Sequence, residues 1–202
     1  GTLSSALSGT DTVKVYDGTV LLGTAAVTGT SWSFADGRSL SHGQAPSYTA
    51  KVSDTAGNVS AAGTAYTATI DTTAPTQTAA VTGLLDDAGS ITGNVSTGGF
   101  TDDTSLTVSG TLSSALSGTD TVKVYDGTVL LGTAAVTGTS WSFADGRSFS
   151  HGQAPSYTAK VSDTAGNVSA AGTADTATID NTPPTQHAPV HDLTAATGRQ
   201  TG

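Results

Sequence analysis

Short runs in which apolar and polar residues alternate recur along the chain and are separated by turn-forming residues. The run 157–161 shows the pattern well, because Tyr157, Ala159 and Val161 alternate with polar residues. Alternation with a period of two places every second side chain on one face of a β-strand. No window repeats its apolar residues with the period of 3.6 that marks a helix. The pattern therefore predicts an all-β protein.

The alternating runs follow one another as in a β-meander. Turn signals separate them, and Asp126-Gly127 is a pair typical of a hairpin turn. Trp141 and Phe143 share one face of their run, so Trp141 is expected to fill a core, with Tyr157 at a strand entry. About seven short antiparallel strands per module are typical of an immunoglobulin-like β-sandwich. The expected strands are 79–84, 105–109, 121–125, 129–136, 140–143, 157–161 and 174–179.

A long internal repeat decides the domain organisation. Residues 1–73 align without a gap with residues 110–182, at an offset of 109 residues. A period of this length is too long for one turn of a solenoid and matches an autonomous domain. The copies differ at three positions, which are Leu40/Phe149, Tyr66/Asp175 and Thr72/Asn181.

The repeat predicts tandem Ig-like modules arranged as a rod. Residues 1–73 are expected to form a module that lacks its first strand, and residues 74–182 a complete module. Residues 183–202 are expected to begin a further module or form a tail, because Pro184-Thr185-Gln186 repeats Pro75-Thr76-Gln77. The sequence is therefore interpreted as a fragment of a longer protein.

Charge and composition narrow the choice of partners. The chain has 7 basic and 16 acidic residues, a net charge of −9, and every acidic residue is Asp. This charge repels nucleic acid and anionic membranes, so neither is expected as a partner. Asp favours turns and hard-cation sites, whereas the absent Glu favours helices. The absence of Cys excludes disulfides and thiolate sites, and no apolar run is long enough to insert into a membrane.

Four motifs resemble a known family. They are Thr69–Pro75 at the module junction, Val52–Ser60 with its copy Val161–Ser169, Gly99–Thr104, and Val124–Gly127 with the later Trp141. They are similar to the signatures of bacterial Ig-like tandem repeats in giant, type I-secreted RTX and biofilm adhesins of Gram-negative bacteria. The resemblance covers nearly the whole chain except its last fifteen or so residues.

The resemblance implies an extracellular structural spacer on the bacterial cell surface. Such repeats would form a calcium-rigidified rod that projects a distal binding domain for adhesion or biofilm formation. Their partners would be the neighbouring modules of the same chain.

Strand order places several acidic residues at the two ends of a module. The loop 101–103 and the strand end at Asp180 should share one end, while the hairpin 163–167 lies at the other and should face Asp71 of the preceding module. Clustered carboxylates repel each other unless a cation lies among them, and calcium prefers such oxygen ligands. The predicted calcium ligands are Asp54, Asp71, Asp102, Asp103, Asp163, Asn167 and Asp180.

The other reading of the hairpin is that Asp163 and Asn167 simply form a turn. A turn is also the prediction for the Asp residues that precede Gly, namely Asp17, Asp36, Asp126 and Asp145. Asp175 is expected at the surface, and Asp86 and Asp87 receive no assignment.

Catalysis has little support in the sequence. His42 and His151 lie in Ser-His-Gly loops with Ser and Asp nearby, but no Gly-x-Ser-x-Gly elbow or His-Glu-x-x-His motif is present. The chain is therefore expected not to be an enzyme. Two alternatives to the spacer stay open: a glycan- or protein-binding module, and a filament subunit. In the filament, residues 183–202 would add a strand to the first module of another copy, head-to-tail.

Overall fold

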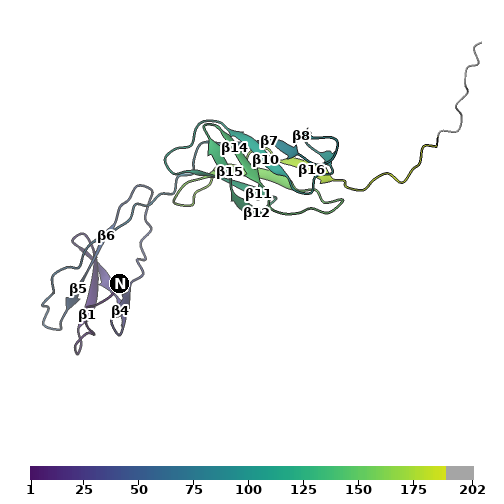
Figure 1. Cartoon of the computed structure of the whole chain (residues 1–202). Helices are drawn as coiled ribbons and strands as arrows, with labels where there is room; N and C mark the ends of the chain where they lie inside the picture. Colours follow the sequence, from purple (N-terminus) through teal and green to yellow (C-terminus); the bar gives the residue numbers. More distant parts are fainter. Residues whose placement is uncertain (190–202) are drawn as a thin grey trace, which may run out of the picture. The chain divides into compact units, whose positions relative to one another are not determined.

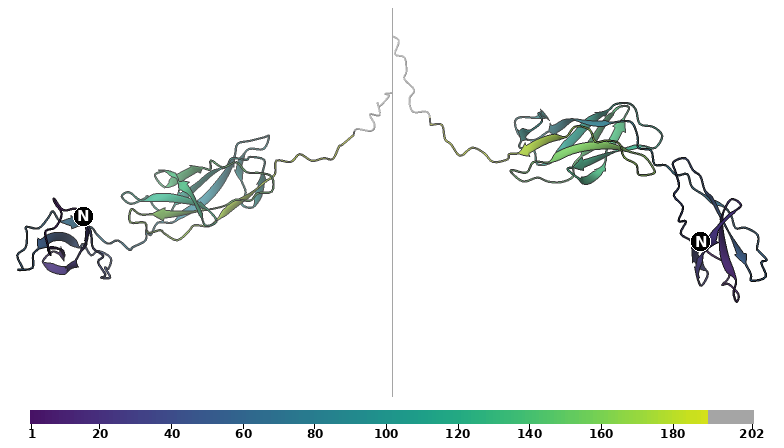
Figure 2. Two further views of the ribbon diagram at one scale, coloured as in Figure 1. Left: turned by 90° about the horizontal axis from the view of Figure 1, so that it is seen from below. Right: turned by 180° about the vertical axis from the view of Figure 1, so that it is seen from behind.

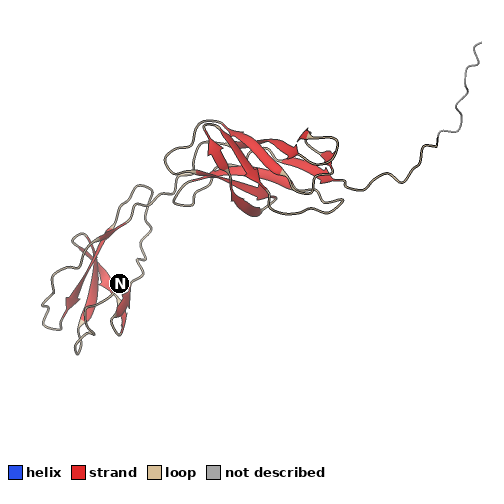
Figure 3. Ribbon diagram, in the orientation of Figure 1, coloured by secondary structure: helices blue, strands red, loops and turns tan. Residues whose placement is uncertain are grey.

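The computed structural model describes residues 1–189, and their regular structure consists of β-strands (Figure 3). The expected all-β fold is confirmed. The chain forms two compact units, one of residues 1–76 with 162–169 and one of residues 77–161 with the chain from Ala170 on; residues 1–76 are called here the first module and residues 77–182 the second (Figure 1). Residues 190–202 of the predicted tail 183–202 lie outside the described residues. Within the described part of the chain, no helix is long and apolar enough to cross a membrane.

The second module contains two sheets that pack face to face (Figure 2). One sheet has the strand order β13-β14-β10-β7-β8, and the other has the order β12-β11-β15-β16-β9. The strands of the first sheet are β7 (Ala79–Asp86), β8 (Gly93–Val95), β10 (Thr107–Leu112), β13 (Ala135–Thr137) and β14 (Ser140–Ala144). The strands of the second are β9 (Gly99–Thr101), β11 (Thr121–Asp126), β12 (Val129–Thr133), β15 (Ser156–Ser162) and β16 (Asp175–Ile179).

The core of the second module lies between these sheets and follows the predicted alternation. Val122 of β11 and Tyr157 of β15 are fully buried, and they share the core with Leu84 of β7 and Val108 of β10. Trp141 of β14 is 3% exposed and joins the same core. The expectation that Trp141 and Tyr157 are core residues is therefore confirmed.

Two features of the strand pattern differ from the expectation. The run 129–136 divides at Ala134 into β12 and β13, because these two strands belong to different sheets. In addition, β9 pairs with β16 in the parallel direction, so the module is not purely antiparallel. The sequence does not reveal β8 or β9, because strands of three residues are too short to show alternation.

The first module has the strands that its sequence shares with the second. A four-stranded sheet has the order β2-β1-β5-β6, and β3 and β4 form a separate pair. Only Val13, Val15 and Ala25 form its buried core, and Trp32, Tyr48 and other apolar residues are half-buried around them. The strands are β1 (Thr12–Asp17), β2 (Val20–Thr24), β3 (Ala26–Thr28), β4 (Ser31–Ser33), β5 (Ser47–Ser53) and β6 (Tyr66–Thr67).

The two copies of the tryptophan allow a matched test of core burial. Trp141→Ala should lower the free energy of unfolding of the second module by about 3–5 kcal/mol, because it removes a buried aromatic ring. Trp32→Ala should cost the first module clearly less, because Trp32 is only half-buried. Chemical denaturation followed by residue-resolved hydrogen exchange would assign each loss to its module.

Trp141→Phe is the control. It keeps an aromatic ring and removes Trp141 Nε1, which is buried without a hydrogen-bond partner among the described residues. Its cost should therefore be smaller than that of Trp141→Ala. Equal losses for Trp32→Ala and Trp141→Ala would contradict the difference in packing.

Candidate functional site

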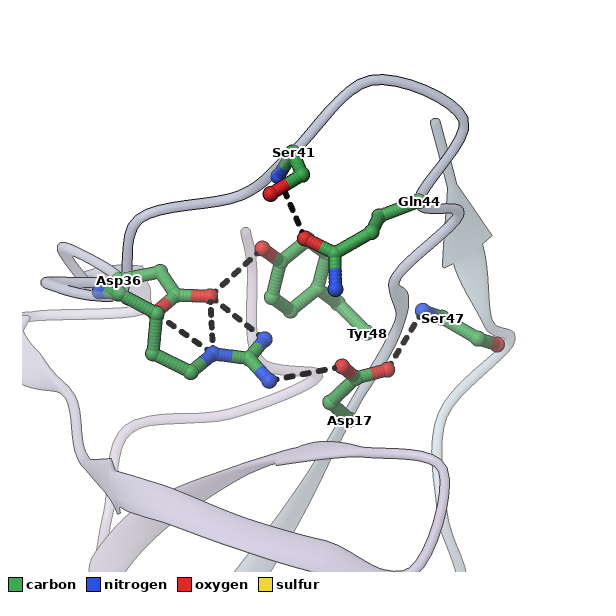
Figure 4. Close-up of polar contacts among 7 residues, drawn as sticks. Asp17, Asp36, Ser41, Gln44, Ser47 and Tyr48 are labelled. Atoms are coloured by element: carbon green, nitrogen blue, oxygen red, sulfur yellow. Dashed lines mark hydrogen bonds and ion pairs between the residues drawn. The ribbon is translucent and has the colours of Figure 1, made fainter. Parts of the chain in front are cut away.

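An arginine at the end of each module's sheet gathers two carboxylates and a tyrosine. In the first module, Arg38 Nε and Nη2 donate to the Asp36 carboxylate at 3.0 and 2.7 Å (Figure 4). Arg38 Nη1 donates to Asp17 Oδ2 at 3.0 Å, and Tyr48 Oη donates to Asp36 Oδ2 at 2.7 Å. Asp17 Oδ1 accepts the N–H of Ser47 at 2.7 Å. The cluster therefore connects the end of β1, the segment after β4 and the beginning of β5.

The second module repeats this cluster in a more buried setting. Arg147 Nη2 contacts Asp145 Oδ2 at 2.7 Å, and Arg147 Nη1 contacts Asp126 Oδ2 at 2.8 Å. Tyr157 Oη donates to Asp145 Oδ2 at 2.7 Å, and the Asp145 side chain is only 2% exposed. A paired guanidinium and a hydroxyl donor satisfy a carboxylate that would otherwise be costly to bury.

The clusters correct one expectation. Asp17, Asp36, Asp126 and Asp145 are more than turn residues, because their carboxylates hold the arginine of each module. The physical reason is that planar guanidinium binds two carboxylates in a fixed geometry. The available signal was the sequence Asp-Gly-Arg in both copies, which contains the single arginine of each aligned repeat.

Hydrogen bonds within the second cluster shift the pKa of two of its members. Burial acts to raise the pKa of Asp145, but hydrogen bonds from Arg147 and Tyr157 outweigh it and hold this pKa below its ordinary value. Burial and the hydrogen bond to Asp145 raise the pKa of Tyr157. The carboxylate therefore stays ionised and the phenol stays protonated near neutral pH.

The strand ends at β9 and β16 bring several predicted calcium ligands together. Thr101 lies opposite Ile179 in the parallel pair, and the N–H of Asp180 donates to the carbonyl of Thr101 at 2.7 Å. Asp102 and Asp103 follow β9 directly, so they lie at the same end of the second module as Asp180. This is the placement that the strand order predicts.

Two carboxylates near this end are buried without a basic partner. Asp86 is 6% exposed and Asp103 is 4% exposed. Asp86 Oδ2 accepts Thr101 Oγ1 at 2.7 Å, and Asp103 accepts the N–H groups of Asp87 and Ser105 at 3.2 and 2.7 Å. Neither carboxylate forms an ion pair with a basic side chain of residues 1–189. Among the described residues, only neutral donors hold these two carboxylates.

Asp102 adds an exposed carboxylate to this acidic end. It lies against the backbone of Gly89, where a Cβ atom would fill the space that the carboxylate occupies. Asp86, Asp102 and Asp103 are called the acidic end below. Asp86 had no assignment from the sequence, because its hydrogen-bond partner Thr101 lies on β9 and becomes its neighbour only in the folded module.

The remaining predicted ligands lie in other loops. Asp163 accepts both the N–H of Asn167 and its Nδ2 at 2.8 Å, so these two residues form the turn that the alternative reading expects. Asp54 accepts the same two groups of Asn58 at 2.8 and 2.7 Å. Each carboxylate is held first by the side-chain amide, which lowers the pKa of Asp54 and of Asp163.

The strand-end aspartates each contact a histidine. Asp71 Oδ1 lies 3.2 Å from His42 Nδ1, and Asp180 Oδ1 lies 3.2 Å from His151 Nδ1. Within the described residues, no group of three His, Cys, Asp or Glu side chains converges as a metal site. A calcium ion at the acidic end would therefore need carbonyl oxygens or water as further ligands. The predicted pairing of Asp71 with Asp163 stays a prediction.

One minor expectation is wrong. Asp175 was expected at the surface, but it is only 6% exposed. The reason is that Asp175 lies on the same face of β16 as Ala177 and Ile179, which is the face that packs into the core. Its counterpart Tyr66 begins the edge strand β6 and is 74% exposed.

Comparison with known proteins supports the fold class. No family model and no curated protein sequence matches the chain. Among solved structures, the chain is similar to fibronectin(III)-like modules of Clostridium thermocellum CbhA, with 11% identity and a TM-score of 0.54. The match covers 95% of this chain and 87% of that chain. At this identity the likeness shows a shared Ig-like β-sandwich fold and does not extend to the adhesin repeats.

The arginine cluster makes a prediction about stability. Arg147→Lys should lower the free energy of unfolding of the second module by about 2 kcal/mol, because a single ammonium cannot reproduce the fork and leaves Asp145 oxygens underpaired. The matched substitution Arg38→Lys should have a smaller effect, because the Asp36 side chain is 15% exposed and can be solvated. Denaturant unfolding with module-specific exchange would measure both. A larger loss from Arg38→Lys would contradict this account.

Acid should weaken the second module through Asp145. The folded-state pKa of Asp145 is lowered, so its contribution is complete above the unfolded value of about 4 and is lost as the pH falls through the folded value. The free energy of unfolding should therefore decrease below about pH 4. The Asp145→Asn variant should start less stable and show a shallower decrease. Parallel slopes for the two proteins in melts between about pH 2 and 7 would refute the assignment.

Proposed function

We propose that the chain is a pair of non-catalytic spacer modules from a bacterial cell-surface adhesin, working outside the cell. The observation that carries this proposal is the tandem repeat of β-sandwich modules that differ at only three of 73 aligned positions. A spacer requires length and mechanical stability from each unit. Each further copy of the module adds length to the chain. Because the copies share nearly all of their surface residues, a further copy adds no new recognition surface.

The arrangement of the histidines supports a non-catalytic role. A catalytic triad uses one ring nitrogen for the nucleophile and the other for the acid. In the first module, Asp71 Oδ1 lies 3.2 Å from His42 Nδ1, and Thr73 Oγ1 lies 3.1 Å from Nδ1 and 3.3 Å from Nε2, so the hydroxyl is not directed at the second ring nitrogen alone. The His42 side chain is 54% exposed, so no sheltered site surrounds it.

Calcium is part of the proposal, and the acidic end is where it would bind. Asp86, Asp102 and Asp103 would hold the ion together with carbonyl oxygens. A bound cation would offset the repulsion among these carboxylates. The same residues already join the end of β7 to the segment after β9 through the hydrogen bond from Thr101 to Asp86. Ion binding would therefore hold the end of β7 and the segment after β9 more firmly together, at the end of the module where the chain leaves it.

Calcium should raise the melting temperature of the chain, and a chelator should reverse the effect. A ligand present at a hundredfold excess over its Kd stabilises the folded form by about 2.7 kcal/mol. Asp102→Asn should reduce the increment, because Asp102 is exposed and forms no hydrogen bond or ion pair in residues 1–189 that the change would break. Asp120→Asn is the charge-matched control outside the acidic end. Identical melting curves with calcium and with chelator would refute the calcium site.

The spacer role is tested separately, with chains of different length. Small-angle scattering of chains with one, two and three copies of residues 74–182 should show a maximum dimension that grows in proportion to copy number. A dimension that saturates would contradict a spacer even if calcium binds.

A further inference from the structure

The four lysines of this acidic chain lie on one face of one sheet in each module. Lys14 of β1 and Lys51 of β5 belong to the first module, and Lys123 of β11 and Lys160 of β15 are their copies in the second. Each lysine stands next to residues of its module's core along the strand, so it points to the opposite side of the sheet. This outer face of the sheets β2-β1-β5-β6 and β12-β11-β15-β16-β9 is called the lysine face below.

The two lysines of a module lie directly opposite one another. Lys14 pairs with Lys51 in the antiparallel register of β1 and β5. Opposed side chains in such a pair have Cβ atoms about 5 Å apart, and like charges in this position destabilise a sheet. In the second module β11 and β15 are also neighbours, and Lys123 and Lys160 occupy the equivalent positions of the repeat. Both copies therefore place two positive charges side by side at an energetic cost.

Only neutral groups hold these ammonium groups. In the second module, Lys123 Nζ donates to Thr133 Oγ1 at 2.6 Å, and Lys160 Nζ lies 5.1 Å from the centroid of the Tyr125 ring. The first module repeats both contacts, at 2.7 and 5.1 Å. None of the four lysines forms an ion pair with a carboxylate in residues 1–189.

The nearest aspartate in the strand is already occupied. Asp126 follows Tyr125 at the end of β11, but its Oδ2 is paired with Arg147 at 2.8 Å. Its Oδ1 accepts the N–H of Ser156 at 2.8 Å. Asp17 makes the matching contacts in the first module. The lysine pair of each module therefore keeps its charge available for an anion from outside the chain.

Hydroxyl groups surround the lysine pair on the same face. In the second module, four half-buried residues alternate with buried ones along β15 and β16, and they are Ser156, Thr158, Thr176 and Thr178. Protein–protein interfaces have an apolar centre and few lysines, so this face does not suit a protein partner. Ser, Thr and Tyr hydroxyls both donate and accept hydrogen bonds, which suits the hydroxyl groups of a sugar.

We propose that the lysine face of each module binds an acidic glycan, in which neutral sugars separate the sugars that carry a carboxylate or sulfate group. The two ammonium groups bind the anion, and the hydroxyls of Tyr125 and Thr158 bind the sugar beside it. This site goes beyond the spacer role, and it uses none of the residues of the acidic end.

The net charge of −9 decides which kind of anion fits. Charges in solution are screened beyond about 8 Å at physiological salt, so the local lysine pair dominates the contact with a sparsely charged glycan. Double-stranded DNA carries one negative charge per about 1.7 Å of its axis, so many of its phosphates would meet aspartates instead. The sparse charge of the glycan is therefore part of the proposal.

The test titrates the full chain with three oligosaccharides in the calorimeter. Hyaluronan oligosaccharides carry carboxylates, keratan sulfate oligosaccharides carry sulfates, and chitin oligosaccharides are the neutral control. We expect two binding sites per chain for at least one of the acidic glycans and none for the neutral one, with an affinity that falls as salt is added. A chelator in every sample keeps calcium from bridging a glycan to the acidic end, so failure of this site leaves the proposed calcium site untouched.

Replacement of the lysines tests the site itself. Lys123→Gln with Lys160→Gln should lower the number of bound oligosaccharides from two per chain to one. The further changes Lys14→Gln and Lys51→Gln should abolish binding. The ligand-free variants should melt at the same temperature as the parent chain or higher, because the changes remove a like-charge pair from each sheet.

A charge-matched variant separates the site from the net charge. Ser140→Asp with Ser142→Asp changes the net charge by the same amount as the Lys123→Gln and Lys160→Gln pair. Both serines are exposed on β14 in the other sheet, so this variant should keep two binding sites.

Four results would overturn the proposal. The first is no saturable binding of either acidic glycan, and the second is equal binding of the neutral one. The third is an equal loss of binding in the serine variant, which would show that net charge alone is sensed. The fourth is tighter binding of a DNA oligonucleotide than of either acidic glycan, which would assign the lysine face to nucleic acid.

Discussion

The apolar face of a β-sheet must be covered by a second layer, and the rest of this structure depends on that requirement. The chain shows its effect with almost no difference in sequence. Tyr157 is fully buried in the second module, whereas its counterpart Tyr48 is half-buried in the first. The difference follows from β7 and β10, which complete the opposing sheet in the second module. Among the described residues, apolar burial, at about 25 cal/mol per Å², is therefore greater in the second module than in the first.

The strength of the arginine clusters depends on the same second layer of the sandwich. The arginine cluster forms with nearly the same distances in both modules, since Arg38 and Arg147 each contact the second Asp of their cluster at 2.7 Å. Its local geometry is thus set by the shared sequence. The contribution of the cluster to the free energy of unfolding differs between the modules, because the Asp145 side chain is 2% exposed and that of Asp36 is 15% exposed. A hydrogen bond in the drier setting is electrostatically stronger and more costly to lose.

Much of the fold could be predicted from the sequence, because alternation and the repeat both reflect short-range rules. The strand around Tyr157 and the core position of Trp141 followed from a period of two. The parallel pairing of β9 with β16 could not be predicted, since a strand of three residues has no readable period and its partner lies far along the chain. The burial of Asp175 was missed for another reason: alternation places it on the face of Ala177 and Ile179, but its charge and the exposed counterpart Tyr66 favour the surface.

Only part of the candidate site could likewise be predicted from the sequence. The shared end of Asp102, Asp103 and Asp180 followed from strand order, whereas Asp86 joins them only through tertiary pairing. Comparison of the buried aspartates then gives the strongest argument about function. Asp145 is buried with a guanidinium, so its charge is already compensated. Asp86 and Asp103 are as deeply buried but receive only neutral hydrogen bonds. Neutral donors stabilise a carboxylate without cancelling its charge, so two such groups in one loop cluster favour a cation from solution. The second module therefore pairs one buried aspartate with its own arginine, whereas Asp86 and Asp103 receive only neutral hydrogen bonds among the described residues.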